Sequence, residues 1–294
     1  MDKVVVIGGS GFLGSHTADV LSERGFAVTL YDREPSPWLR DDQNMVVGDM
    51  LDEEKISEAV SGARYVYHFA GVADIAEAAE NPVNTINLNV LGAATAAMAA
   101  VNNHVERLVY ASTMYVYSPF GSFYRASKQA AETVIEAFSG KYGLDYTFLR
   151  YGSLYGPRAQ PWNGLRKYVE QIVKEEKLFY PGTGNERREY IYVRDAARLS
   201  VDILDKKHAN SAITVTGHQV LNSNELVDMI FEITGVKPKV EYAKNPSSVD
   251  HYEMTPYRYT PKMARKLVPE EYVDIGQGIL ELVEEIHQEN SKNN

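Results

Sequence analysis

The sequence of 294 residues contains no cysteine, which excludes disulfide frameworks, thiolate metal sites and cysteine nucleophiles. It has no excess of basic residues either, since 30 Lys and Arg stand against 40 Asp and Glu, for a net charge of −10. A general nucleic-acid binder needs the opposite sign, because neutralising phosphates supplies most of its affinity. The sequence also lacks the apolar run of roughly 20 residues that crosses a bilayer, and its start lacks a signal-peptide core. We therefore expect a cytoplasmic protein with no nucleic-acid or membrane partner.

Two further kinds of catalytic centre lack their sequence patterns. None of the seven histidines has ligand spacing of the H-E-x-x-H type, so no metal site is expected. Ser10 lies in a glycine turn that does not have the G-x-S-x-G pattern of hydrolase nucleophiles.

What the sequence does contain is an alternation of short β-branched runs and helical patterns. Expected strands cover residues 3–7, 27–31, 45–47, 65–69, 107–111 and 146–150, and expected helices cover 12–24, 52–60, 84–102 and 123–138. The runs are apolar without alternation, as in strands of a parallel sheet that is buried on both faces. This predicts an α/β fold, in which residues 1–150 form a Rossmann-type doubly wound parallel sheet that binds the cofactor. Residues 151–294, interrupted by Gly and Pro, are expected to form a smaller mixed α/β region, mainly for substrate, within the same compact body.

A glycine turn follows the first expected strand and opens the first expected helix. Gly8, Gly11 and Gly14 are spaced G-x-x-G-x-x-G, one residue away from the usual dinucleotide pattern. Glycines in this position let the oxygens of a diphosphate reach backbone N–H groups at a helix N-terminus. Ser15 stands where a mononucleotide P-loop would need its lysine. The alternative is a tight turn with a purely structural role.

The end of the second expected strand carries an acid. Asp32 lies 18 residues after Gly14, where a carboxylate can accept hydrogen bonds from ribose hydroxyls and would repel a 2′-phosphate. This favours NAD over NADP. The neighbouring Arg33 could accommodate a 2′-phosphate, so NADP stays open as an alternative.

A phenol and an ammonium group lie four residues apart on an expected helix. Tyr124 and Lys128 therefore share one face of it. A free tyrosine has a pKa of about 10, and a nearby Lys cation favours the phenolate that a general base needs at neutral pH. Ser112 and Thr113 end the preceding strand, where a hydroxyl group can meet the tyrosine.

With further motifs in the same order, the sequence resembles the extended short-chain dehydrogenase/reductase family, in particular its NAD-dependent epimerases and dehydratases that act on nucleotide sugars. The resemblance covers nearly the whole chain. Besides the residues above, it rests on Gly48-Asp49-Met50, His68-Phe69-Ala70-Gly71, Asn89-Val90-x-Gly92, Arg150-Tyr151-x-x-Leu154-Tyr155-Gly156-Pro157 and Arg188-Glu189-Tyr190-Ile191-Tyr192-Val193-x-Asp195.

The resemblance implies NAD as cofactor, a nucleotide-diphosphate sugar as substrate, and a role for each matching residue. Tyr124 would be the catalytic acid/base, and Thr113 its hydroxyl partner. Lys128 would lower the pKa of Tyr124 and bind the ribose. The implied cofactor-binding residues are Gly8, Gly11, Phe12, Leu13, Gly14, Asp32, Arg33, Asp49, Met50, Phe69, Ala70, Gly71, Asn89, Ser112, Tyr124, Lys128 and Tyr151. The implied substrate-binding residues are Val72, Thr113, Ser153, Arg188 and Arg258, with Arg188 on the diphosphate. For Arg188 and Glu189 the alternative is an adjacent surface ion pair.

The sequence departs from the family pattern in three places. Ser153 stands where many relatives carry an asparagine. The segment of residues 117–124 is shorter than the corresponding segment of typical relatives. Met114 and Tyr115 follow Thr113, where 4,6-dehydratases usually carry Asp-Glu and the related decarboxylases a Glu. Those reactions need an acid. Tyr115 and Tyr117 are expected to be pocket walls or core residues.

These features predict an NAD-dependent nucleotide-sugar 4-epimerase that works through a transient 4-keto sugar. One alternative is a C4 ketoreductase or dehydrogenase on the same scaffold, or less readily a dehydratase. The other is a dinucleotide-binding protein without catalytic activity.

The expected helix over residues 84–102 is rich in alanine. Relatives commonly dimerise through this helix and the one that carries Tyr124, so the resemblance implies a homodimer. The alternative is that the small side chains pack on the sheet of their own chain. The six alanines concerned are Ala93, Ala94, Ala96, Ala97, Ala99 and Ala100.

Overall fold

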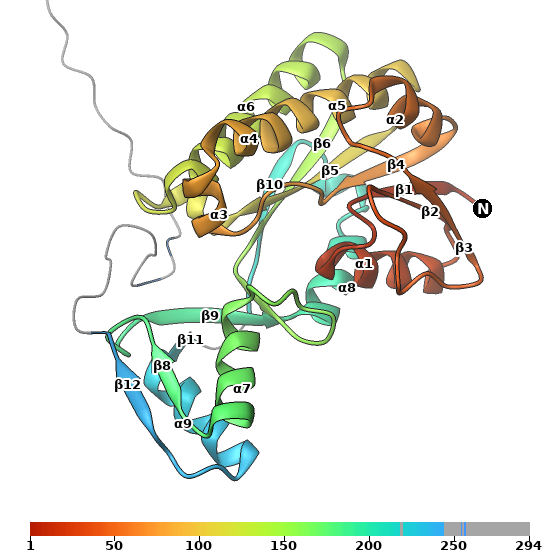
Figure 1. Ribbon diagram of the computed structural model, residues 1–294. Helices are drawn as coiled ribbons and strands as arrows, with labels where there is room; N and C mark the ends of the chain where they lie inside the picture. Colours follow the sequence, from red (N-terminus) through yellow and green to blue (C-terminus); the bar gives the residue numbers. More distant parts are fainter. Residues whose placement is uncertain (218–219, 244–253, 255, 257–294) are drawn as a thin grey trace, which may run out of the picture. The chain divides into compact units, whose positions relative to one another are not determined.

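The computed structural model describes residues 1–217, 220–243, 254 and 256. A seven-stranded sheet, parallel throughout, has the order β10-β6-β5-β4-β1-β2-β3 (Figure 1). Its strands are β1 (Lys3–Ile7), β2 (Ala27–Asp32), β3 (Gln43–Val47), β4 (Ala63–His68), β5 (Arg107–Thr113), β6 (Asp145–Tyr151) and β10 (Ser211–Val215). The predicted doubly wound parallel sheet is confirmed. The strand order reverses between β1 and β4, so a ligand site is expected beyond their carboxyl ends.

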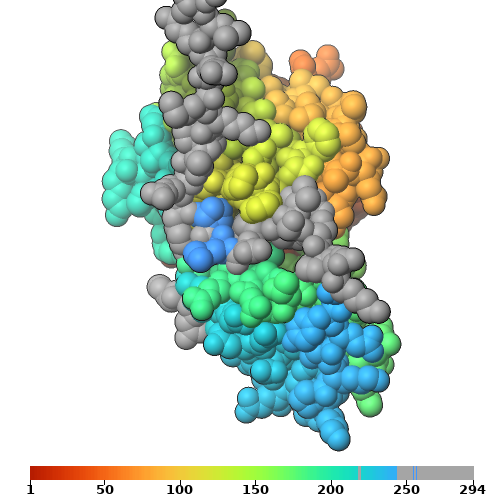
Figure 2. All heavy atoms as spheres, turned by 90° about the vertical axis from the view of Figure 1, so that its left-hand side faces the viewer, coloured from red at the N-terminus to blue at the C-terminus, as the bar shows by residue number. Residues whose placement is uncertain are grey.

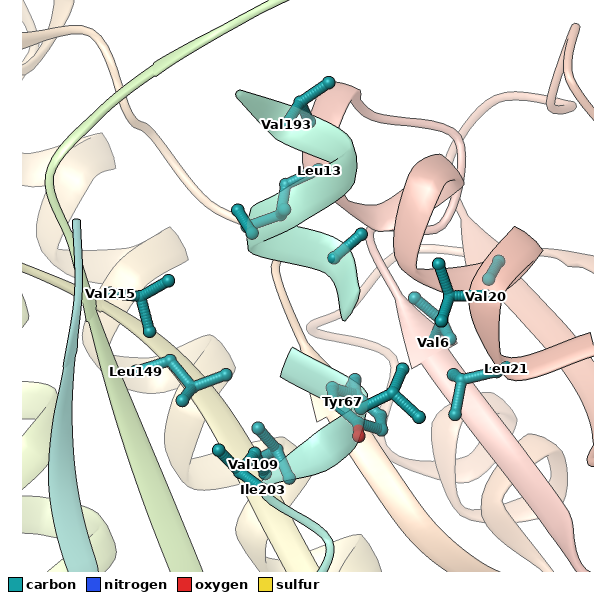
Figure 3. Close-up of a cluster of buried hydrophobic side chains, with 14 of the residues drawn as sticks. Val6, Leu13, Val20, Leu21, Tyr67, Val109, Leu149, Val193, Ile203 and Val215 are labelled. Atoms are coloured by element: carbon teal, nitrogen blue, oxygen red, sulfur yellow. The ribbon is translucent and has the colours of Figure 1, made fainter. Parts of the chain in front are cut away.

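Helices cover both faces of this sheet. The helices α2 (Glu53–Val60), α5 (Gly92–Asn102) and α6 (Ser122–Tyr142) lie on one face, and α1 (Phe12–Glu23) and α8 (Val193–Asp202) lie on the other (Figure 1). Along β1, Val4 and Val6 join the core beneath α1 and α8, while Val5 and Ile7 join the opposite core. Figure 3 shows the first of these cores. A strand buried on both faces explains the uninterrupted apolar run in its sequence.

The helix expected over residues 84–102 is divided into three segments. It begins at Pro82 as α4 (Pro82–Ile86), continues as the π-helical turn η1 (Asn87–Leu91), and ends as α5. Single π-helical turns of this kind are often found at functional sites. Here the turn contains Asn89, which is 1% exposed.

The alanines of α5 pack mainly within their own chain. Five of the six, all except Ala94, are buried in the core between α5 and the sheet. Packing on the sheet therefore accounts for them, and the homodimer stays a prediction.

Most of the described residues beyond 151 form a smaller region with its own core. A three-stranded sheet joins β7 (Ser153–Tyr155), β9 (Arg187–Tyr192) and β11 (Val220–Asn222), and β8 (Leu178–Tyr180) pairs with β12 (Val240–Tyr242). Helices α7 (Gly164–Glu175) and α9 (Ser223–Thr234) pack with these strands through Ile172, Leu178 and Phe231, among others. In space-filling view, the green and blue atoms of these elements form one continuous surface (Figure 2). The remaining elements are α3 (Ile75–Glu80) and the 3-10 turns η2 (Met114–Tyr117) and η3 (Lys206–His208).

Among the described elements of the second half of the chain, β10 joins the large sheet and α8 packs against it. Arg107 of β5, which is 1% exposed, attaches the segment between them. Its Nη1 donates to the carbonyl oxygens of Ile203 at 2.9 Å and Asp205 at 3.2 Å, just beyond the end of α8. The Ile203 carbonyl follows the end of the helix, where carbonyls lack an intrahelical donor, so the guanidinium supplies one. The Asp205 oxygen also accepts a hydrogen bond from the His208 N–H at 3.1 Å.

Replacing Arg107 by alanine should lower the free energy of unfolding by about 2–4 kcal/mol, because the Ile203 carbonyl loses this donor and a cavity opens. Arg64→Ala is the matched control, since the side chain of Arg64 is 43% exposed and pairs with Asp2 and Glu106 at the surface. That control should cost less than about 1 kcal/mol. Urea unfolding followed by circular dichroism measures both losses, and equal losses would contradict a special role for Arg107.

Candidate active site

At two positions of the turn between β1 and α1, the packing of the protein's own backbone leaves room only for glycine. Gly8 has φ +86°, and a Cβ there would overlap the backbone of Ala70, which follows β4. A Cβ on Gly14 would overlap the carbonyl oxygen of Gly8. The turn therefore brings the backbone after β1 against the backbone after β4, at the edge where the strand order reverses.

Gly11 differs from these two glycines. Its φ of −76° suits any residue, and a Cβ there would meet only the Gly8 oxygen, at 3.3 Å. Gly11 is the N-cap of α1, and within the described part of the chain no side chain caps this helix. The first N–H groups of a helix carry partial positive charge and need an acceptor. A diphosphate would be such an acceptor, and a Cβ on Gly11 would crowd it, so the turn fits a dinucleotide.

The carboxylate of Asp32 is held against this turn. Its Oδ2 accepts a hydrogen bond from the Ser10 N–H at 3.0 Å, at the carboxyl end of β2, while the next residue, Arg33, is exposed. Close by in the sheet, the Tyr31 hydroxyl donates to the carbonyl oxygen of Asp49 at 2.6 Å. Burial raises the pKa of Tyr31 to about 12, and the charges of Asp52 and Asp49 act in the same direction, so Tyr31 remains a donor. The strand-end residues predicted to meet the adenosine half of the cofactor therefore lie at one edge.

Asn89 connects the loop after β4 to helix α6. Its Oδ1 accepts from the Val72 N–H at 2.8 Å, and its Nδ2 donates to the Val72 oxygen at 3.0 Å and to the Ser127 Oγ at 2.9 Å. The sequence predicted that Asn89 lines the cofactor. In the structure both of its amide hydrogens are donated to the chain's own groups, which places the loop of residues 69–72 beside the residue that precedes Lys128.

Tyr124 and Lys128 lie one turn apart on α6, at the end of β5. Lys128 is 5% exposed, and its Nζ donates to the Ala111 oxygen of β5 at 2.9 Å and lies 4.8 Å from the centroid of the Tyr110 ring. Burial lowers the pKa of Lys128 to about 8 against the opposing effect of Glu132. These contacts bring the helix that carries Tyr124 to the strand that ends at Thr113.

A hydroxyl and an aromatic ring complete the surroundings of Tyr124. Thr113 Oγ1 accepts a hydrogen bond from the Tyr115 N–H at 3.2 Å, which starts the turn η2. The Tyr115 ring meets the Tyr124 ring edge to face, with 6.0 Å between their centroids. Ile75 and Phe120 pack into the same cluster.

A neutral histidine lies on the same sheet face as Lys128. His68, which is 1% exposed, stacks on Tyr110 with 5.7 Å between ring centroids. Among the residues that the structure describes, neither His68 ring nitrogen nor the Tyr110 hydroxyl has a partner. Burial, assisted by the charge of Lys128, lowers the pKa of His68 to about 3. His68 therefore stays uncharged near Lys128 at neutral pH.

Several predicted site residues are placed differently from the groups above. The Ser112 hydroxyl donates to Glu132 at 2.5 Å, and the Tyr151 hydroxyl lies 2.6 Å from the Ser200 Oγ of α8, so both are engaged within the protein. Ser153 and Arg188 lie in the three-stranded sheet, on β7 and β9, and Arg188 is half-buried. Arg258 lies outside the described residues.

Glu132 is a buried acid that the motif analysis did not single out. The available signal was its position four residues after Lys128, on the same face of the helix. Within the described ranges no group of three or more His, Cys, Asp or Glu side chains could hold a metal ion. Nor is any helix there long and apolar enough to span a membrane.

The reversed strand order, with an uncapped glycine turn at the switch point, defines a Rossmann-type α/β protein. Residues 4–216 match the model of the NAD dependent epimerase/dehydratase family, and the chain belongs to this family. NAD is therefore its cofactor, and the resemblance to NAD-dependent epimerases and dehydratases of the extended short-chain dehydrogenase/reductase type is confirmed.

Three similar proteins illustrate the range of this family. The chain is 26% identical to a putative UDP-glucose 4-epimerase of Methanocaldococcus jannaschii, over 95% of this chain and 97% of that one. It is also 26% identical to a UDP-N-acetyl-alpha-D-glucosaminuronate decarboxylase of Bacillus cytotoxicus, over 87% and 88% of the two chains. The crystal structure of a UDP-glucose 4-epimerase of Thermotoga maritima with UDP-glucose has a TM-score of 0.79 and 26% identity, covering 88% of this chain and 90% of that one.

The two kinds of glycine in the turn should respond differently to substitution. Gly14→Ala should destabilise the protein even without cofactor, because the new Cβ overlaps backbone. Gly11→Ala should leave the cofactor-free protein nearly as stable but weaken NAD binding by about tenfold or more, roughly 1.4 kcal/mol. Thermal unfolding and calorimetric titration with NAD measure the two effects. Unchanged NAD affinity in Gly11→Ala would contradict a diphosphate at this helix end.

His68 should make the protein less stable in acid. Its lowered pKa means that the unfolded chain binds this proton more readily, so the stability is fully present above the ordinary value of 6.5 and is lost as pH falls toward 3. The loss should approach about 1.4 kcal/mol per pH unit. Urea unfolding at several pH values should therefore show a shallower acid loss for His68→Phe than for the parent, whereas the exposed control His104→Asn should keep the parental slope.

Proposed function

We propose that the protein is a nucleotide-sugar 4-epimerase in which Tyr124 is the catalytic acid/base. The observation that carries the proposal is the attachment of the buried Lys128 to β5, which brings Tyr124 to the strand end at Thr113. This strand end lies at the same edge of the sheet as the glycine turn of a family whose cofactor is NAD.

The residues of the chain supply proton transfer and orientation. The Tyr124 phenolate, favoured by the Lys128 cation, would take the proton of the sugar C4 hydroxyl, and the Thr113 hydroxyl would hold the same oxygen. NAD, when bound, supplies the capacity to accept the C4 hydride and return it. The 4-keto sugar would then rotate in the site to present its opposite face, and Tyr124 would give the proton back. Substrate and product therefore differ only in configuration at C4.

The segment after Thr113 favours epimerisation over reactions that need a second acid. Met114 and Tyr115 occupy the positions where dehydratases and decarboxylases carry carboxylates; Met114 is fully buried and Tyr115 is 8% exposed. Tyr115 contributes a ring to the cluster around Tyr124. Expelling water or supporting decarboxylation would need a carboxyl group there, and a phenol with its ordinary pKa of about 10 is a much weaker acid.

The substrate would be held through its diphosphate. Arg188 on β9 is the proposed cation for this group. Ser153 on the adjacent β7, and Val72, which Asn89 holds, are the further proposed substrate-binding residues. The similar epimerase from Thermotoga maritima, whose structure includes UDP-glucose, supports a nucleotide-sugar substrate. Asp32, fixed by the Ser10 N–H, favours NAD over NADP.

Tyr124→Phe should lower kcat by about 10³-fold or more, because it removes the acid/base. It should leave the bound dinucleotide in place. Tyr142→Phe is the matched control, since Tyr142 is exposed at the far end of the same helix, and it should retain parental activity. The assay is an NMR screen of UDP-, dTDP-, GDP- and CDP-hexoses for C4 epimers, with the dinucleotide identified by mass after denaturation.

Each alternative function gives a different result in this assay. Stoichiometric formation of NADH or NADPH from added oxidised cofactor would identify a C4 dehydrogenase, or a ketoreductase run in reverse, and loss of water from the sugar would identify a dehydratase. A protein that binds NAD but converts none of the sugars, with no effect of Tyr124→Phe, would match the non-catalytic alternative.

A further inference from the structure

Helix α6 carries a buried acid that the proposed reaction does not use. Glu132 is 7% exposed. Its Oε1 accepts hydrogen bonds from the Ser112 Oγ at 2.5 Å and the Arg150 Nε at 3.0 Å, and its Oε2 accepts one from the Arg150 Nη2 at 2.6 Å. A carboxylate is this deeply buried only when it is paired, and the bidentate arginine satisfies that requirement.

The partner of Glu132 extends the network to the turn η2. The Arg150 Nη1 donates to the Tyr117 hydroxyl at 2.5 Å, and the guanidinium carbon lies 4.7 Å from the centroid of that ring. Ser112 precedes Thr113 in the chain, and Tyr117 ends the turn that begins directly after it. The network therefore forms hydrogen bonds to the chain on both sides of Thr113, at Ser112 and at Tyr117.

Two neighbouring residues of α6 donate hydrogen bonds to uncharged backbone carbonyls of the same segment. Arg125 donates to the Ser118 oxygen at 3.0 Å, and Gln129 donates to the Val116 oxygen at 2.8 Å. Glu132 is the member of this series that accepts hydrogen bonds and brings a negative charge into the interface between α6 and the sheet.

That charge acts on Lys128. The groups that face Lys128 from the sheet are the neutral His68 on β4 and the ring of Tyr110 on β5, and Tyr124 lies one turn away on α6. Arg150 on β6 and Tyr117 on η2 lie on the other side of Glu132. Burial lowers the pKa of Lys128 and so favours the neutral amine, and the Glu132 carboxylate opposes this.

We propose that Glu132 is a positioning residue of the reaction, which fixes Thr113 against α6 and supplies the countercharge that keeps Lys128 protonated beside Tyr124. This role rests on the proposed function of Tyr124 and Lys128.

Three variants separate charge, geometry and general effects of substitution. Glu132→Gln keeps the size and removes the charge, Glu132→Asp keeps the charge and shortens the reach, and Glu136→Gln removes an exposed charge one turn further along α6. In Glu132→Gln the alkaline fall of kcat should move to lower pH by about one unit, with little change in KM. Glu132→Asp should keep the alkaline limit and lose about tenfold or more in kcat. Glu136→Gln should match the parent in both.

A second readout does not depend on turnover. The titration of the Lys128 ammonium can be followed by ¹⁵N NMR in the protein with its bound NAD, with Lys128→Met used for assignment. Glu132→Gln should lower the pH at which this signal titrates by about one unit, and Glu136→Gln should not. If no nucleotide sugar is epimerised but Lys128 still responds, the proposed function fails and the countercharge role of Glu132 stands.

An unshifted Lys128 titration with an unshifted alkaline limit would overturn the proposal, and a lower melting temperature alone would then leave Glu132 a structural role. Should Glu132→Gln fail to fold with Arg150 uncompensated, Glu132→Gln/Arg150→Gln removes both charges. The double variant should show a smaller Lys128 shift in the same direction, and no shift would again overturn the proposal.

Discussion

The buried ammonium of Lys128 sets the requirements for the residues around it. A cation between a sheet and a helix is costly unless its hydrogen bonds and its charge are compensated. The Ala111 carbonyl accepts one of its hydrogens, and the Tyr110 ring presents a π-face to it. His68 can occupy the neighbouring position only as a neutral ring, which its burial ensures. Glu132 supplies the opposite charge, and it in turn requires Arg150.

The sheet topology explains why this arrangement lies beside the glycine turn. All seven strands are parallel, so their carboxyl ends lie at one edge, and the reversal at β1 and β4 opens that edge to a ligand. The π-helical turn η1 contributes by directing Asn89 inward, where it ties Val72 to Ser127. The loop after β4 and the helix that carries Tyr124 are thereby held together by one side chain.

The sequence was most informative where the pattern is local. Uninterrupted β-branched runs predicted six of the strands, and the spacing of Tyr124 and Lys128 predicted their shared helix face. The seventh strand, β10, is defined by its pairing with β6 some 60 residues earlier, which no local pattern encodes. The π-helical turn adds one residue to a helical turn without changing the amino-acid composition, so the sequence pattern does not predict it. Glu132 lies four residues after Lys128 on a helix, where a carboxylate is usually exposed to solvent. Its burial depends on Arg150, which comes from the strand β6.

The choice of reaction rests on the segment between Thr113 and α6. Tyr124 and Lys128 suit any chemistry that begins with oxidation at C4, so they do not by themselves distinguish an epimerase from a dehydratase. In this chain the segment carries Met114 and Tyr115, and Gly121, with φ +94°, lies so close to the Tyr115 ring that a Cβ would meet it. Arg150 and Glu132 anchor the other side of the segment through Tyr117 and Ser112. An aromatic group is therefore fixed where other reactions need an acid, and the proposed 4-epimerase needs only the proton that Tyr124 exchanges.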